Sequence, residues 1–179
     1  MKWRKNIFVT GPSRSGKSTV ISRIVERLDK GATGFFTTEI RDGARRVGFS
    51  ITTLQGNRGI LAHQDLAAGP RLGKYRVNLE DLEKIAVPSM VPDSTMEIVV
   101  VDEVGKMECF SELFRKRLLQ VLDSENVVLG SIALRGDNFI EKIKTRPDVQ
   151  LLPLSEKTRD LLPKIILDKI SAIWQEVNS

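Results

Sequence analysis

The sequence has few of the residues on which disulfide-stabilised and zinc-binding proteins depend. It contains one cysteine, Cys109, and one histidine, His63. A single cysteine excludes an internal disulfide, and one residue of each type leaves no Cys/His set for zinc. We expect both to be packing or surface residues, because a nucleophilic cysteine needs a neighbouring base and none is evident.

Long apolar runs are also absent. No window approaches the roughly 18 uninterrupted apolar residues that a transmembrane helix needs. The basic N-terminus is followed by an apolar run of only three residues, Ile7 to Val9, which is short for a signal peptide. These absences predict a cytoplasmic protein that does not enter a membrane.

The composition that is present is typical of a globular protein. The 179 residues are 41% hydrophobic and 28% charged, enough to bury the core of one domain spanning 1–179. The net charge of +5 favours anionic partners. Because the basic residues are scattered along the chain, the charge permits a nucleic-acid partner but does not indicate one. We expect a monomer.

A phosphate-binding motif follows the first apolar run directly. Residues 11–19 read G-P-S-R-S-G-K-S-T, which fits G-x-x-x-x-G-K-S. The glycines let backbone N–H groups turn toward phosphate oxygens, and the next helix directs its positive end at them. A glycine- and serine-rich turn with an incidental lysine is the alternative, which the preceding strand and following helix disfavour. The expected nucleotide-binding residues are Gly11, Pro12, Ser13, Arg14, Ser15, Gly16, Lys17, Ser18 and Thr19.

Two side chains of this loop have specific expected roles. Lys17 would reach the β- and γ-phosphates. Ser18 would offer its hydroxyl to Mg²⁺, a cation that prefers oxygen ligands and keeps several waters. The motif therefore predicts a triphosphate site with a magnesium cofactor.

The first third of the chain divides into a helix and a β-rich segment. Apolar residues recur at helical spacing from Val20 to Leu28, and Gly31 is expected to end that helix. Short β-branched and aromatic runs follow, separated by Asp-Gly and Gly-Asn turns, which is typical of antiparallel hairpins. We predict a β insertion at about 34–77.

The rest of the chain alternates helices and strands. Asn78 is expected to cap a helix over 79–86, and Pro88 and Pro92 to break the chain after it. Strands are predicted at 98–101, 127–134 and 149–152, with Asp137 capping a short helix and Pro163 in the first turn of the last. This alternation predicts an α/β fold, a mainly parallel sheet flanked by helices.

Two acids end the apolar strand at 98–101. Asp102 would hold Mg²⁺ directly or through a second shell opposite Ser18, and Glu103 would orient or deprotonate the attacking water. A strand that merely exits into solvent is the structural alternative, which the phosphate loop disfavours. D-E-V-G also fits a GTPase switch, but no N-K-x-D segment is present to recognise guanine. An acid beside the magnesium acid favours the additional-strand (ASCE) class of P-loop proteins.

Basic residues near the ends of the predicted strands are further candidates. Lys106 would lie near the phosphates, or would pair with Glu108 or Glu112 at a helix start. Arg135 follows the strand at 127–134 and would stabilise transition-state charge in cis, or lie on the surface. Arg14 is a weaker candidate for that role, since its side chain can point outward.

Several segments resemble the thermophilic nucleoside-triphosphatase family, over Lys5 to about Pro163. The likeness lies in residues 11–19, 33–41, 46–49 and 73–77, and above all in D-E-V-G-K-M-E at 102–108. It implies a RecA-like P-loop fold and Mg²⁺-dependent hydrolysis of ATP, GTP and other triphosphates with little base preference. The binding residues implied within that block are Asp102, Glu103, Gly105 and Lys106.

The sequence departs from the family pattern at two places. Arg14 stands where the family's loop usually has glycine, and would either crowd the phosphates or add a positive charge. Thr158 stands where the family has asparagine, before an arginine that matches. We expect that arginine, Arg159, to stack on or border the nucleobase, although the departure puts base preference in doubt.

Three functions fit these observations. Hydrolysis of triphosphates without an acceptor is the leading hypothesis, with Lys17, Glu103 and Arg135 as catalytic residues. A nucleoside, nucleotide or polynucleotide kinase would use the same loop, with an acceptor pocket in the β insertion. A regulatory module whose slow hydrolysis times binding to a partner is the third.

Overall fold

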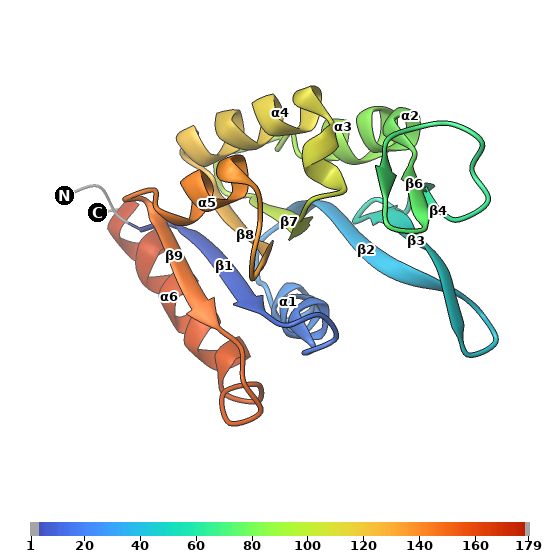
Figure 1. The fold of residues 1–179 in the computed structure, drawn as a ribbon. Coiled ribbons are helices and arrows are strands. Elements are labelled where there is room, and N and C mark those ends of the chain that lie inside the picture. The colour runs from blue at the N-terminus through green and yellow to red at the C-terminus, as the bar shows by residue number, and fades with distance from the viewer. Residues whose placement is uncertain (1–3, 178–179) are drawn as a thin grey trace.

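A nine-stranded sheet with helices on both faces forms the described part of the chain, residues 4–177 of a computed structural model (Figure 1). The strands are β1 (Asn6–Gly11), β2 (Ala32–Asp42), β3 (Arg45–Thr53), β4 (Arg58–His63), β5 (Arg71–Leu72), β6 (Tyr75–Val77), β7 (Ile98–Val104), β8 (Val127–Ala133) and β9 (Val149–Pro153). The helices are α1 (Lys17–Val25), α2 (Leu79–Asp81), the π-helical η1 (Leu82–Ala86), α3 (Val87–Ser89), the 3₁₀ turn η2 (Glu108–Phe110), α4 (Glu112–Asp123), α5 (Asn138–Lys144) and α6 (Leu162–Val177).

The strand order is β5-β6-β4-β3-β2-β7-β8-β1-β9. From β2 to β9 neighbouring strands run parallel, and from β2 to β5 they run antiparallel. The predicted parallel sheet with an antiparallel insertion is therefore confirmed. β8 lies between β1 and β7, so an additional strand separates the strand before the phosphate loop from the strand that carries the two acids.

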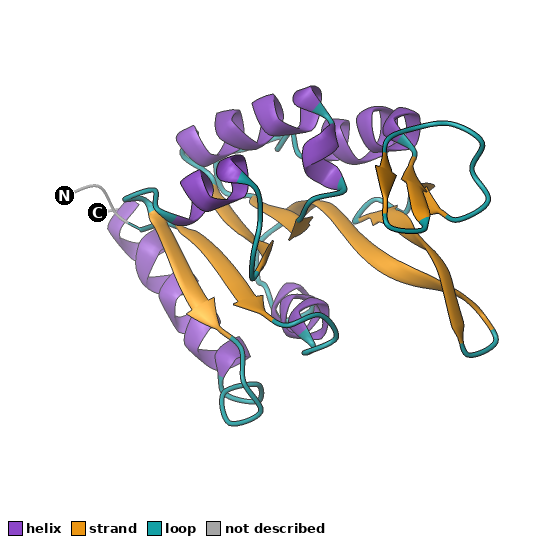
Figure 2. Cartoon of the chain, in the orientation of Figure 1, coloured by secondary structure: helices purple, strands orange, loops and turns teal. Residues whose placement is uncertain are grey.

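Side chains of the central strands alternate between two apolar cores. Phe8 packs into the core beneath α4, α5 and η1, whereas Ile7 and Val9 pack with α1 and α6. Figure 2 shows the same two helical layers, one on each side of the sheet. Burial on both faces explains why these strands are apolar throughout, as is typical of parallel sheets.

The antiparallel insertion begins inside a strand that also belongs to the parallel part of the sheet. β2 pairs in parallel with β7 over Ala32–Phe36 and antiparallel with β3 over Phe35–Asp42. One strand thus belongs to both parts of the sheet. At the crossover, a Cβ on Gly34 (φ +111°) would lie 1.9 Å from the Val100 carbonyl oxygen, so only glycine allows this close approach.

The helix predictions hold best at their capped ends. Asn78 accepts a hydrogen bond from the Asp81 N–H (3.2 Å) and Asp137 accepts one from the Ile140 N–H (3.0 Å), as expected of caps. Pro163 is the second residue of α6, also as expected.

Two helix ends differ from the prediction. The first helix ends at Val25 and not near Gly31, although Leu28 still packs against the core. The helical segment after Asn78 continues through Pro88 to Ser89, because Pro88 lies in the first turn of α3, where no N–H is needed. No helix in residues 4–177 is both long enough and apolar enough to cross a membrane.

Candidate active site

A cavity of about 580 Å³ opens at the carboxyl ends of the parallel strands. The phosphate loop and the start of α1 form one wall, and Glu103 of β7 faces them. Ala133 and Leu134 at the end of β8 line another side. The remaining wall comes from the insertion and consists of Thr37, Thr38, Glu39 and Phe49.

The loop has the backbone conformation that phosphate binding needs. Gly16 precedes α1 in the left-handed region (φ +98°), and Arg14 is also left-handed (φ +62°). The Ser15 N–H donates to the Pro12 carbonyl oxygen at 3.2 Å, which closes the turn. Such alternation of conformations directs successive N–H groups toward one side, and the N-terminus of α1 adds its positive end.

Lys17 is buried and is held by the loop itself. Its Nζ donates to the carbonyl oxygens of Gly11 (3.0 Å) and Pro12 (3.1 Å) and lies 3.7 Å from Glu103 Oε2. A cation held by carbonyls and one carboxylate in a cavity is suited to receive phosphate oxygens in their place.

Asp102 is fully buried at the end of β7. Its Oδ1 accepts a hydrogen bond from the Ser131 hydroxyl of β8, while Oδ2 has no partner among the described residues. Burial raises the pKa of Asp102 to about 6, against which the hydroxyls of Ser131 and Ser18 lower it. A buried carboxylate oxygen without a partner beside the Ser18 hydroxyl is a donor set that fits Mg²⁺.

Glu103 differs from Asp102 although it is the next residue. Its side chain is 33% exposed and lines the cavity, where it lies near Lys17. Glu103 can therefore contact a water molecule in the cavity. Asp102 has no exposed surface with which to do so. The two neighbouring acids are thus suited to different tasks.

Glu108 is a buried acid to which sequence reasoning gave no role. A Cβ on Gly105 would lie 2.9 Å from Glu108 Oε2 and 3.0 Å from Glu103 Oε1, so both carboxyl groups pack closely against this glycine. Burial, and then the charge of Glu103, raise the pKa of Glu108 to about 8 against the N–H groups of Glu108 and Gly105, which lower it. Its place at the end of the D-E-V-G-K-M-E block was the available signal.

The three candidate arginines lie at different distances from the cavity. Arg14 lines it and forms an ion pair with Glu39 (Nε to Oε1, 3.3 Å). Arg159 lies against the loop, with its Nε 3.8 Å from where a Gly16 Cβ would be. Arg135 is exposed and follows Leu134 just outside the lining.

Lys106 is exposed on the loop after β7. The ion pairs of the described residues join it neither to Glu108 nor to Glu112. The alternative in which Lys106 pairs with one of these acids at a helix start is therefore not realised.

Several residues of the site were not predicted, namely Ser131 and the insertion residues Thr37, Thr38, Glu39 and Phe49. Ser131 was detectable as a polar residue within the apolar run 127–133. Thr38, Glu39 and Phe49 lie in segments 33–41 and 46–49, which resemble the family, but only the pairing of β2 with both β7 and β3 brings them to the cavity.

The phosphate loop, the acid pair and the additional strand between them define the class as a P-loop NTPase. A family model described as NTPase matches residues 6–167, so the chain belongs to this family of nucleoside-triphosphatases. The resemblance read from the motifs is therefore confirmed.

Curated relatives match nearly the whole chain. The nucleoside-triphosphatase THEP1 of Thermotoga maritima is 45% identical over 162 residues, covering 90% of this chain and 92% of the relative. The human cancer-related nucleoside-triphosphatase is 34% identical over 180 residues, covering 90% of this chain and 95% of its own length.

Solved structures agree with this assignment. The crystal structure of THEP1 from Aquifex aeolicus superimposes with a TM-score of 0.84 at 32% identity, covering 92% of this chain and 98% of the other. The solution structure of the human cancer-related enzyme gives 0.77 at 34% identity, covering 93% and 97%. The RecA-like fold expected from the motifs is thus confirmed.

Proposed function

We propose that the protein hydrolyses nucleoside 5′-triphosphates, ATP and GTP among them, to diphosphate and phosphate, with Mg²⁺ and with little base selectivity. The observation that carries the proposal is the meeting of Lys17 and Glu103 in one cavity beside the phosphate loop. The matched relatives are named nucleoside-triphosphatases, which does not favour the kinase alternative.

The loop residues would bind the triphosphate and orient it. Backbone N–H groups of residues 12–17 and the start of α1 grip the phosphates, and Lys17 pairs with the β- and γ-phosphate oxygens. Ser18 and Asp102 would hold Mg²⁺, which when bound neutralises charge on those oxygens. Arg159 borders the nucleobase from the β9 side of the loop.

Glu103 acts as the base in this proposal. It takes a proton from a water molecule while the water oxygen bonds to the γ-phosphorus, and the bond from the γ-phosphorus to the bridging oxygen breaks. Arg135 and Lys106 supply positive charge at the rim, and Gly105 leaves room for the Glu103 side chain. The diphosphate departs with the electron pair of the broken bond.

The test is phosphate release from each of the four ribonucleoside triphosphates, with and without Mg²⁺. Replacing Glu103 with Gln should preserve nucleotide binding and lower kcat about 10²- to 10⁴-fold, because only the transition state needs the base. Lys17→Ala should lose both turnover and nucleotide binding. Unchanged turnover of Glu103→Gln would reject its assignment, and acceptor-dependent consumption of ATP would favour a kinase.

The proposed enzyme also has an expected oligomeric state and cellular location. It acts as a single-domain monomer in the cytoplasm, and its scattered positive charge permits a nucleic-acid partner without indicating one. Light scattering of the purified full chain tests the monomer, since a mass near 20.1 kDa is expected.

A further inference from the structure

Arg14 is held in a backbone conformation that disfavours it. Among residues 4–177 it is the one non-glycine residue with a positive φ, +62°. A side chain at such a position is strained where glycine is not. An outlier of this kind inside a phosphate loop points to a use for the side chain.

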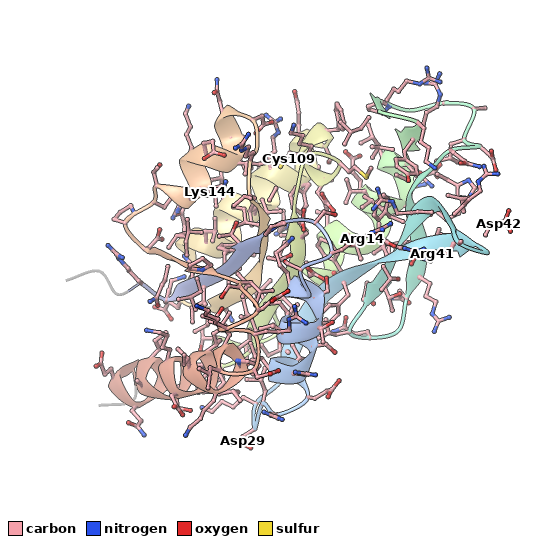
Figure 3. All side chains as sticks on the ribbon, turned by 60° about the horizontal axis from the view of Figure 1, so that its bottom comes forward. Arg14, Asp29, Arg41, Asp42, Cys109 and Lys144 are labelled. Atoms are coloured by element: carbon pink, nitrogen blue, oxygen red, sulfur yellow. The ribbon has the colours of Figure 1, made fainter. Side chains whose placement is uncertain are left out.

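The side chain of Arg14 reaches from the loop to the insertion. Its Nε lies 3.3 Å from Oε1 of Glu39 on β2, and both residues line the cavity that also contains Lys17. Figure 3 shows Arg14 beside Arg41, a second residue that pairs with Glu39. The pair therefore joins two walls of the same cavity.

Glu39 does not need Arg14 as a partner. Its carboxylate accepts hydrogen bonds from Arg46 Nη1 at 2.9 Å and from Arg41 Nη2 at 2.7 Å. Arg46 is itself fixed by the Tyr75 hydroxyl (3.0 Å) and packs against Phe49. Arg46 foremost, then Arg41 and last Arg14, lower the pKa of Glu39 to about 2 against its partial burial.

Arg14 is accordingly the loosest cation of the group. Its side chain is 60% exposed, and an exposed ion pair is weak and easily exchanged. Three arginines around one carboxylate leave an excess of positive charge beside the phosphate loop. A phosphate group arriving there offers Arg14 charged oxygens that Arg41 and Arg46 do not already occupy.

The strand order indicates which phosphate Arg14 would meet. β2 is the neighbour of β7, so Glu39 lies on the side of the cavity that carries Glu103, whereas Arg159 lies on the side of β9. An arginine that points toward Glu39 therefore lies on the side where the γ-phosphate would face the base.

We propose that Arg14 exchanges Glu39 for the γ-phosphate when a nucleoside triphosphate enters, and so distinguishes triphosphate from diphosphate. This inference rests on the proposed function, since it assumes that the loop binds nucleotide. No covalent step is involved: one ion pair breaks and another forms.

The test compares Arg14→Gly with the unchanged protein by calorimetry, using the β,γ-imido analogue of ATP and ADP, both with Mg²⁺. Affinity for the analogue should fall about tenfold, the value of one charge-assisted hydrogen bond, while affinity for ADP changes less than about twofold. Glycine suits the left-handed backbone, so the melting temperature should not fall. Arg45→Ala, which removes the same charge from the hairpin tip, should leave both affinities unchanged.

The outcomes separate this inference from the proposed function. Equal loss of both affinities, or no loss, overturns the role of Arg14, whether or not the protein hydrolyses triphosphates. If Arg14→Gly loses affinity for the analogue but not for ADP, and no phosphate is released from any triphosphate, the hydrolytic function is rejected. The role of Arg14 in binding the γ-phosphate is then still supported. Arg14→Lys should recover part of the lost affinity, since it restores the charge without the planar group.

Discussion

Three carboxylates within seven residues have three different environments. Asp102 is buried with one oxygen free, Glu103 faces the cavity, and Glu108 is buried behind Gly105. In the proposed function, these environments suit Asp102 to hold a cation and Glu103 to accept a proton. The residue types are visible in the sequence, but their environments are not.

Replacing Glu108 with Gln should change how stability depends on pH. The pKa of Glu108 is about 8 in the folded protein against 4.5 in its ordinary state, so between these values the folded protein keeps a proton that the unfolded chain loses. The free energy of unfolding of the unchanged protein therefore falls as pH rises from 4.5 to 8, and this contribution is absent in the variant.

Urea unfolding at pH 5 and pH 9 measures the difference. The variant should nearly match the unchanged protein at pH 5 and exceed it by about 5 kcal/mol at pH 9. Glu125→Gln, at an exposed glutamate, is the matched control and should show no such change. A Glu108 variant that is equally destabilised at both pH values would show that the carboxyl acts through packing alone.

β2 is the element that connects the nucleotide-binding core to the insertion. Its first half completes the parallel sheet and its second half carries Thr38 and Glu39 to the cavity. The pattern of β-branched and aromatic residues predicted a strand here but could not tell which partners it would have. The partners are set by neighbours that lie far along the chain.

Gly34 and Gly43 offer a matched test of this junction. Both have positive φ, but a Cβ would meet the Val100 carbonyl oxygen at Gly34 and nothing within 4 Å at Gly43. Gly43→Ala should lower the free energy of unfolding by about 1 kcal/mol from backbone strain, whereas Gly34→Ala should lower it by about 3 kcal/mol or more because β2 must move away from β7. Urea titration checks both; equal losses would mean that the close approach does not anchor the junction.

At the scale of the whole molecule, ligand binding and folding are linked. The cavity is built from β1, β2, β3, β7 and β8, so a ligand that fills it binds only the folded chain. Such a ligand stabilises the folded state by an amount that grows with its concentration relative to Kd.

The Mg²⁺ complex of the β,γ-imido analogue, at about 100 times its Kd, should add about 2.7 kcal/mol and raise Tm by about 5–10 °C. Lys17→Ala should abolish this increase because the loop loses its central cation, whereas Lys164→Ala, at an exposed lysine of α6, should retain it. Differential scanning calorimetry gives both values. An undiminished increase in Lys17→Ala would place the ligand elsewhere.

The sequence by itself determined the phosphate loop, the acid pair, the helix caps and the alternation of strands and helices. Each of these depends on residues close together in the chain, whose spacing fixes the local backbone and the buried face. The tertiary structure alone decided that β2 pairs with both β7 and β3, that Ser131 meets Asp102, and that Glu39 meets Arg14. These contacts join distant segments, and they exist only once the strand order has brought those segments to one edge of the sheet.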